Sequence, residues 1–86
     1  MAWPTKDFYL NKGYKEHGFN TYVKIMANGT ITIIVGDNLD IRILEDATGA
    51  LSSMLVTVGV QSSIHHMQDI FVGYFLNAAE NTLNRC

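Results

Sequence analysis

Three short segments between residues 19 and 45 alternate apolar and polar side chains, and this alternation limits the possible folds more than any other feature of the sequence. The segments read FNTYVKIM, TITIIV and LDIRIL. Each is rich in β-branched residues, which favour the pleated, half-buried surface of a sheet. Short stretches with Asn, Asp and Gly separate them, as expected for tight turns. The pattern predicts an antiparallel β-meander with strands at about 19–26, 30–35 and 39–45.

The register of the first hairpin depends on its loop, because a shift of one residue moves every side chain of a strand to the other face. A two-residue loop at 28–29 would mix apolar and polar residues on both faces. A three-residue loop at 27–29, with Gly29 in the left-handed bulge position, keeps the apolar residues together. We therefore expect two apolar cross-strand pairs in this hairpin: Ile25 with Ile31, and Val23 with Ile33.

The same reasoning places a three-residue loop at 36–38, between the second and third strands. The expected pairs are again apolar: Val35 with Leu39, Ile33 with Ile41, and Ile31 with Ile43. One face of the sheet is then uncharged across both hairpins and should form the core: Val23, Ile25, Ile31, Ile33, Val35, Leu39, Ile41 and Ile43. The agreement between the two hairpins supports this assignment.

The opposite face is mostly polar, as is typical of the solvated face of an antiparallel sheet. Four larger apolar residues interrupt it: Tyr22, Met26, Ile34 and Leu44. An N-terminal arm, residues 1–18, could cover them, because it carries four aromatic rings: Trp3, Phe8, Tyr9 and Tyr14. We expect the arm to pack on the body through these rings, with a short strand or helical turn near Phe8. Residues 1–86 should then form a single domain.

Residues 46–62 allow two interpretations. With a four-residue loop at 46–49, residues 51–60 become a fourth strand that pairs Ile43 with Ser52, Ile41 with Met54, and Leu39 with Val56. Its inward side chains are then Met54, Val56, Val58 and Val60. Alternatively, Thr48 caps a helix that begins near Leu51 and breaks at Gly59. The valine content favours the strand.

The last element should be a helix over about 63–83, capped by Ser62 or Ser63. At 100° per residue, one broad apolar stripe forms the face that we expect to meet the sheet: Ile64, Met67, Ile70, Phe71, Tyr74, Phe75 and Ala78. A second apolar strip lies beside it: Val72, Leu76, Ala79 and Leu83. The predicted fold is therefore α+β, a meander of three to four strands packed against one long C-terminal helix.

One sheet covers only one side of one helix, so the second strip needs another cover. The N-terminal arm, a helix at 50–58 or a second copy of the chain could supply it. Leaving two or three leucine-sized side chains in water would forfeit several kcal/mol, at about 25 cal/mol per Å². A small domain has little stability to spare. We therefore expect a homodimer whose helices pack across a two-fold axis.

Charge and cysteine content exclude several classes of protein. The net charge is −2, and the first 24 residues carry four lysines against two carboxylates. This mild asymmetry is neither a DNA-binding stripe nor an acidic DNA-mimicking face. Cys86 is the only cysteine, so we expect a reducing compartment, the cytoplasm or the host cytoplasm if the protein is viral. No apolar run approaches a bilayer-spanning length, and no signal-peptide pattern is visible.

Few residues suggest catalysis or metal binding. The rings of His65 and His66 point about 100° apart on a helix, and His65 with Asp69 alone would make a weak metal site. His17 has no nearby nucleophile. The only carboxylate cluster falls in turns and on the polar face: Asp37, Asp40, Glu45 and Asp46. We therefore expect no catalytic residue, no metal and no cofactor.

Three functions follow from these observations, in decreasing order of support. The first is a non-enzymatic protein-interaction module, a homodimeric accessory or inhibitor protein of a kind that viruses also encode. Its contacts, with itself or a partner, would be Val72, Leu76, Ala79, Leu83, Tyr22, Met26, Ile34 and Leu44. The second binds single-stranded nucleic acid or a nucleotide through interleaved rings and cations: Lys12, Tyr14, Lys15, Tyr22 and Lys24. The third is a small enzyme at a dimer seam.

Overall fold

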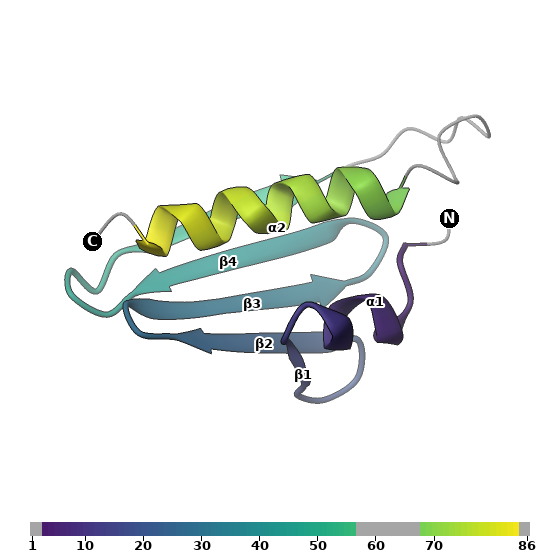
Figure 1. The fold of residues 1–86 in the computed structure, drawn as a ribbon, viewed down its shortest axis with the longest axis horizontal. Coiled ribbons are helices and arrows are strands. Elements are labelled where there is room, and N and C mark those ends of the chain that lie inside the picture. The colour runs from purple at the N-terminus through teal and green to yellow at the C-terminus, as the bar shows by residue number, and fades with distance from the viewer. Residues whose placement is uncertain (1–2, 57–67, 85–86) are drawn as a thin grey trace.

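The computed structural model describes residues 3–56 and 68–84 and has an α+β fold, as predicted. A five-stranded antiparallel sheet has the strand order β1-β2-β3-β4-β5, and two helices pack on one of its faces (Figure 1). In chain order the elements are α1 (Lys6–Asn11), β1 (Lys15–Glu16), β2 (Thr21–Met26), β3 (Gly29–Val35), β4 (Leu39–Glu45), β5 (Leu51–Val56) and α2 (Gln68–Asn84). No helix in these described ranges is both long and apolar enough to cross a membrane.

The two hairpins that join β3, β4 and β5 have the predicted register. Val35 lies opposite Leu39 and Ile33 opposite Ile41 across the first of them. Across the second, Ile43 lies opposite Ser52 and Leu39 opposite Val56. The strand interpretation of residues 51–56 is therefore confirmed, and the helix that would begin near Leu51 is wrong. The rest of that prediction, including Val58 and Val60, lies outside the described residues.

The register of the first hairpin is corrected by the structure. Met26 lies opposite Gly29, so the loop has two residues, at 27–28, and both loops considered from the sequence are wrong. Tyr22, Lys24 and Met26 therefore point to the helical side, and Ile25 points to the other side of the sheet, where it is 82% exposed. The apolar-pairing rule failed here because the inward residues of β2 pair with distant segments, Tyr22 with Tyr9 of α1 and Lys24 with Glu80 of α2.

Contacts from both ends of the chain hold this register. The Tyr9 ring stacks on the Tyr22 ring with centroids 4.6 Å apart. At the turn, the Asn28 side-chain amide donates to the Leu83 carbonyl at 2.9 Å. A Cβ on Gly29 would overlap the Leu44 carbonyl oxygen and come within 2.8 Å of Leu83 Cδ2. Gly29 is thus required for a close approach between β3, β4 and α2, and not for a left-handed bulge.

Helix α2 is rotated relative to the prediction. The strip assigned to a dimer partner is fully buried within the core: Val72, Leu76, Ala79 and Leu83. The stripe expected to meet the sheet instead leaves Ile70, Phe71 and Tyr74 exposed. Buried Gly73 lies on the side of α2 that faces α1, where an added Cβ would make ordinary contacts with Lys12 and Phe8. Ile64 and Met67 lie outside the described residues.

The N-terminal arm packs on the body through its rings, but on the helical face of the sheet and not over Ile34 and Leu44, which it was expected to cover. Tyr9 and Tyr14 are buried, and Phe8 meets Tyr9 edge to face at 5.2 Å between centroids. The indole Nε1 of Trp3 donates to the Gly36 carbonyl at 2.9 Å, which ties the arm to the loop between β3 and β4. The helical turn expected near Phe8 is α1. The arm thus completes the layer that covers one face of the sheet.

Candidate interaction surface

The second face of the sheet has no cover from the described residues, because α1 and α2 both lie on the first face (Figure 1). We call this second face the open face. Strand alternation and the observed register assign these residues to β2–β5 on it: Val23, Ile25, Thr30, Thr32, Ile34, Asp40, Arg42, Leu44, Leu51, Ser53 and Leu55. Six of these side chains are aliphatic, although a solvated face is usually polar.

A continuous row of residues crosses the open face at one end. Ile25 lies opposite Thr30, Thr30 opposite Leu44, and Leu44 opposite Leu51. The three aliphatic members are 82%, 42% and 65% exposed in that order. Neighbouring side chains on one sheet face lie about 5 Å apart, so the row forms one strip that is aliphatic on β2, β4 and β5 and carries Thr30 on β3. Scattered single exposed leucines need no explanation, whereas a contiguous strip indicates a contact surface.

A shallow groove continues this strip toward β1. It has a volume of about 430 Å³ and is lined by Lys15, His17, Val23, Ile25 and Thr30. Its floor is therefore aliphatic and its rim carries one lysine and one histidine. Ile25 and Thr30 belong to both the row and the groove, so the two features form one surface.

The charges on the open face largely neutralise one another. Arg42 and Asp40 lie on this face and form an ion pair with 3.2 Å between the guanidinium Nη2 and the carboxylate Oδ2. Such an exposed pair contributes little to stability, but it leaves the middle of the face without net charge. Lys15, at the rim of the groove, then supplies the positive character of this surface.

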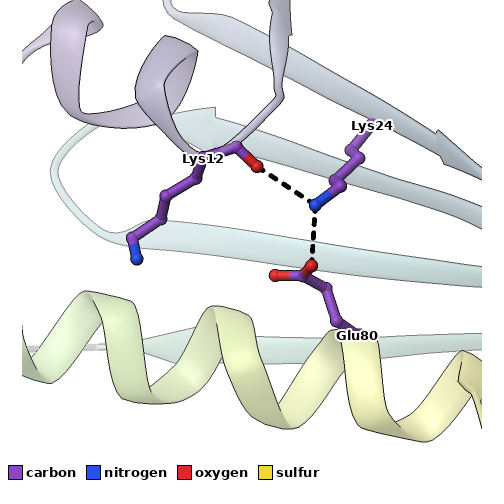
Figure 2. A network of polar contacts seen from close by, with 3 residues as sticks. All are labelled: Lys12, Lys24 and Glu80. Atoms are coloured by element: carbon purple, nitrogen blue, oxygen red, sulfur yellow. Dashed lines mark hydrogen bonds and ion pairs between the residues drawn. The ribbon is translucent and has the colours of Figure 1, made fainter.

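The helical side of the sheet holds a polar network that joins three elements, as Figure 2 shows. The Lys24 ammonium lies 2.7 Å from Glu80 Oε1 on α2 and donates to the Lys12 carbonyl at the end of α1, at 3.0 Å. It also lies 5.5 Å from the centroid of the Tyr14 ring. Burial raises the pKa of Tyr14 above its ordinary value, and the Glu80 carboxylate raises it further. This network fixes the helices on the sheet.

The residues predicted to contact nucleic acid do not form one surface. Tyr14 and Tyr22 are buried, and Lys24 is held by the Glu80 carboxylate. The Lys12 ammonium lies 5.2 Å from the centroid of the Phe8 ring on the helical side, whereas Lys15 borders the groove on the open face. The sheet therefore separates the two remaining cations.

The predicted protein contacts are likewise divided. Ile34 and Leu44 lie on the open face. Tyr22 belongs to the core on the other face, and the half-buried Met26 packs against that core. Three exposed members of the open face were not predicted as contacts: Ile25, Leu51 and Leu55. The predicted pairing of the fourth strand already places Leu51 and Leu55 on the open face, so the sequence could have identified them as contact residues. Ile25 was missed because the one-residue error in β2 placed it in the core.

The histidines and carboxylates do not assemble into a metal site in the part of the chain that the structure describes. No group of three or more His, Cys, Asp or Glu side chains occurs within ligating reach among those residues. His17 is exposed at the groove rim, and Asp69 begins α2. His65 and His66 lie outside the described residues.

Comparison of the chain with protein-family models, with curated proteins and with solved structures found no match.

Proposed function

We propose that this chain is a non-enzymatic interaction module, of accessory or inhibitor type, that binds another protein through the open face of its sheet. The observation that carries the proposal is the exposed row in which Ile25, Leu44 and Leu51, on three strands, are joined through Thr30 on a fourth. A row of this kind lowers the free energy only when something covers it, because apolar area in water is unfavourable.

The size of the apolar strip is sufficient for a binding site. Full burial of one leucine-sized side chain contributes about 1.5–3 kcal/mol relative to full exposure. Burying the three aliphatic residues of the row would therefore contribute several kcal/mol toward the cost of association. Residues such as Ile25, at the centre of a desolvated patch, are where binding energy usually concentrates.

The chemistry of the surface indicates which kind of protein surface would fit it. The floor of the groove is aliphatic, and Lys15 stands at the rim while the Arg42–Asp40 pair is neutral as a whole. A matching protein would present an apolar ridge with a carboxylate at its margin, because complementary charge at the rim favours correct encounter. With a lone cysteine in the sequence, a reducing compartment such as the cytoplasm suits such a protein.

Affinity capture with a paired variant tests the proposal. The Ile25→Lys/Leu51→Lys double variant places two charges in the row, where both side chains are largely exposed and the fold should tolerate them. We expect the wild-type chain to retain a discrete partner protein that the double variant loses. A Tyr74→Lys/Ile70→Lys variant, with the same charge change on the exposed surface of α2, should retain it. Equal capture by all three chains would refute binding through the open face.

Single-stranded nucleic acid or a nucleotide is the second candidate ligand. The observation in its favour is the combination of Lys15 and His17 at the groove with Phe19, whose ring is 90% exposed in the following turn. An aromatic platform beside a cation suits a stacked base. Fluorescence anisotropy with an oligo-dT probe at low and high salt tests this. Salt-sensitive binding that Lys15→Ala and Phe19→Ala both reduce would support it, and unchanged anisotropy would end it.

A further inference from the structure

The two edges of the sheet differ in how they are protected. At one edge, β1 has two residues, and both are charged, Lys15 and Glu16. At the other edge, β5 has six residues, LSSMLV, with neither a charge nor a proline. Exposed strand edges in monomeric proteins are normally made short, charged, bulged or covered, because their free N–H and C=O groups can pair with another strand. Among the described residues, β1 therefore has the short, charged form of a protected edge, whereas β5 has no charge, no proline and no cover.

The hydrogen bonds at the start of β5 show which of its backbone groups face the free edge. The Glu45 N–H donates to the Ala50 carbonyl at 3.0 Å, so these residues form a hydrogen-bonded pair. Such pairs recur at every second residue of an antiparallel ladder. The backbone groups of Ser52, Met54 and Val56 therefore face β4. Those of Leu51, Ser53 and Leu55 face outward, and no described residue pairs with them.

These outward groups are complementary to a second copy of themselves. An antiparallel partner strand related by a two-fold axis through Ser53 places Ser53 opposite Ser53 of the second copy. The same register places Leu51 opposite Leu55 of the second copy, and these side chains are 65% and 64% exposed in the single chain. Every outward N–H then meets an outward C=O, and no charge lies opposite another.

Helix α2 presents a partly exposed aromatic ring toward the same edge. Gly73 of α2 faces α1, which lies over the β1 and β2 side of the sheet. Phe71 precedes Gly73 by two residues and so lies about 200° away around the helix, on the flank toward β5. Its side chain is 42% exposed. A two-fold axis perpendicular to the sheet keeps both α2 helices in one layer, with Phe71 of each copy turned toward the seam.

We propose that two copies of this chain pair along β5, antiparallel and centred on Ser53, to form one continuous sheet with a shared open face. The occupant of the edge is thus a second copy of the chain, joined by β-augmentation. The inference goes beyond the proposed function, because it concerns the edge of the sheet and not its open face. Either can fail while the other stands, since self-association is measured on the purified chain alone.

Analytical ultracentrifugation of the wild-type chain over a wide concentration range is the first test. The expected result is a reversible equilibrium that reaches the mass of two chains. In NMR hydrogen exchange, the amides of Leu51, Ser53 and Leu55 should become more protected as concentration rises, whereas those of Ser52 and Met54 are protected throughout. A mass of one chain at every concentration, or equal protection of the outward amides at all concentrations, would overturn the proposal.

A proline at position 53 tests the edge directly. Ser53→Pro removes an N–H that faces outward and leaves the ladder to β4 intact, so the edge strand should tolerate it. The dimer loses two central hydrogen bonds, and its dissociation constant should rise roughly thirtyfold. Far-ultraviolet circular dichroism establishes that the variant is folded. An unchanged dissociation constant in the folded variant contradicts pairing along β5.

Opposite charges at the same position test the register and do not depend on the proline variant. Ser53→Lys and Ser53→Glu each place like charges opposite one another on the axis, so each variant alone should dimerise about fivefold more weakly. An equimolar mixture should recover wild-type association, because lysine then faces glutamate. Asn81→Lys, at an exposed position on α2, is the matched control and should not weaken the dimer. Failure of the mixture to recover would overturn the Ser53-centred register.

Discussion

The two faces of the sheet carry similar aliphatic side chains but differ in what covers them. On the helical face, Ile31, Ile33 and Ile41 have no exposed surface. On the open face, Ile25 and Leu51 keep most of theirs. Residue type alone therefore does not separate a core isoleucine from a contact isoleucine. The difference lies in the second layer, because burial stabilises the folded chain only where α1 or α2 supplies the partner surface.

The largest difference between the faces should appear on truncating one isoleucine from each. Ile33→Ala leaves a cavity beneath the helices and should lower the free energy of unfolding by about 2–5 kcal/mol. Ile25→Ala removes only exposed atoms, so its effect should stay within roughly 0.5 kcal/mol. Urea denaturation monitored by circular dichroism compares the two. Similar losses in both variants would show that the faces are equally buried in solution.

A methyl group added at a covered glycine should lower the free energy of unfolding more than one added at an uncovered glycine. Gly29→Ala forces a Cβ against the Leu44 carbonyl and the Leu83 side chain, so it should cost about 1–3 kcal/mol. Gly36→Ala is the matched control, because the nearest atom to its Cβ would be the Asn38 carbonyl oxygen at 3.8 Å. Thermal unfolding of both variants provides the measurement. A Gly29→Ala protein as stable as Gly36→Ala would mean that α2 does not press on this turn.

The buried tyrosines should make the free energy of unfolding fall at alkaline pH. Burial, followed by the neighbouring charges of Tyr22 and Asp69, raises the pKa of Tyr9 above its ordinary value. Above about pH 10 the unfolded chain loses this proton while the folded chain keeps it, so stability is full below that pH and falls as the pH rises further. Denaturation curves at pH 8 and above about pH 10 measure the effect.

Replacing the buried tyrosine hydroxyls should weaken this dependence. The Tyr9 and Tyr14 hydroxyls are buried and have no hydrogen-bond partner among residues 3–56 and 68–84. Tyr9→Phe removes the group that ionises and should leave the protein at neutral pH equally stable or about 1 kcal/mol more stable. Its free energy of unfolding should then fall less at high pH than that of the wild type. If the free energy of unfolding of Tyr9→Phe falls with pH as steeply as that of the wild type, another group causes the loss of stability at alkaline pH.

The smallest effect on stability is expected on the open face. Ile25→Lys/Leu51→Lys should change the free energy of unfolding by less than roughly 1 kcal/mol, since charges at exposed positions are well solvated. The same variant should bind an apolar fluorescent dye less strongly than the wild type. A large loss of stability in this variant would show that the row already has a cover within the chain.

The sequence was most informative where contacts are local. The loops at 36–38 and 46–49 are short, and only one register of each keeps Ile31, Ile33 and Ile41 on one face with apolar partners. The strand pairing of β3, β4 and β5 could therefore be predicted from residues close together in the chain. The open-face residues Leu51 and Leu55 are a direct consequence of that pairing.

The sequence was least informative where distant segments meet. In β2, the inward positions are taken by Tyr22, which stacks on Tyr9, and by Lys24, which pairs with Glu80. Their partners lie 13 and 56 residues away, so a rule that pairs apolar residues across one turn chose the wrong face. The same limit applied to α2, where the narrower of the two apolar strips is the one that the core buries.

Alternation and turn chemistry by themselves determined that this chain forms an antiparallel meander followed by a helix, and they set the register of two hairpins. Only the tertiary structure decided which side of β2 and which strip of α2 face inward. The physical reason is that the sequence period of an element specifies its faces, whereas long-range contacts select which face is buried. The contacts of Tyr22 with Tyr9 and of Lys24 with Glu80 make that selection for β2. They leave Ile25 on the outside.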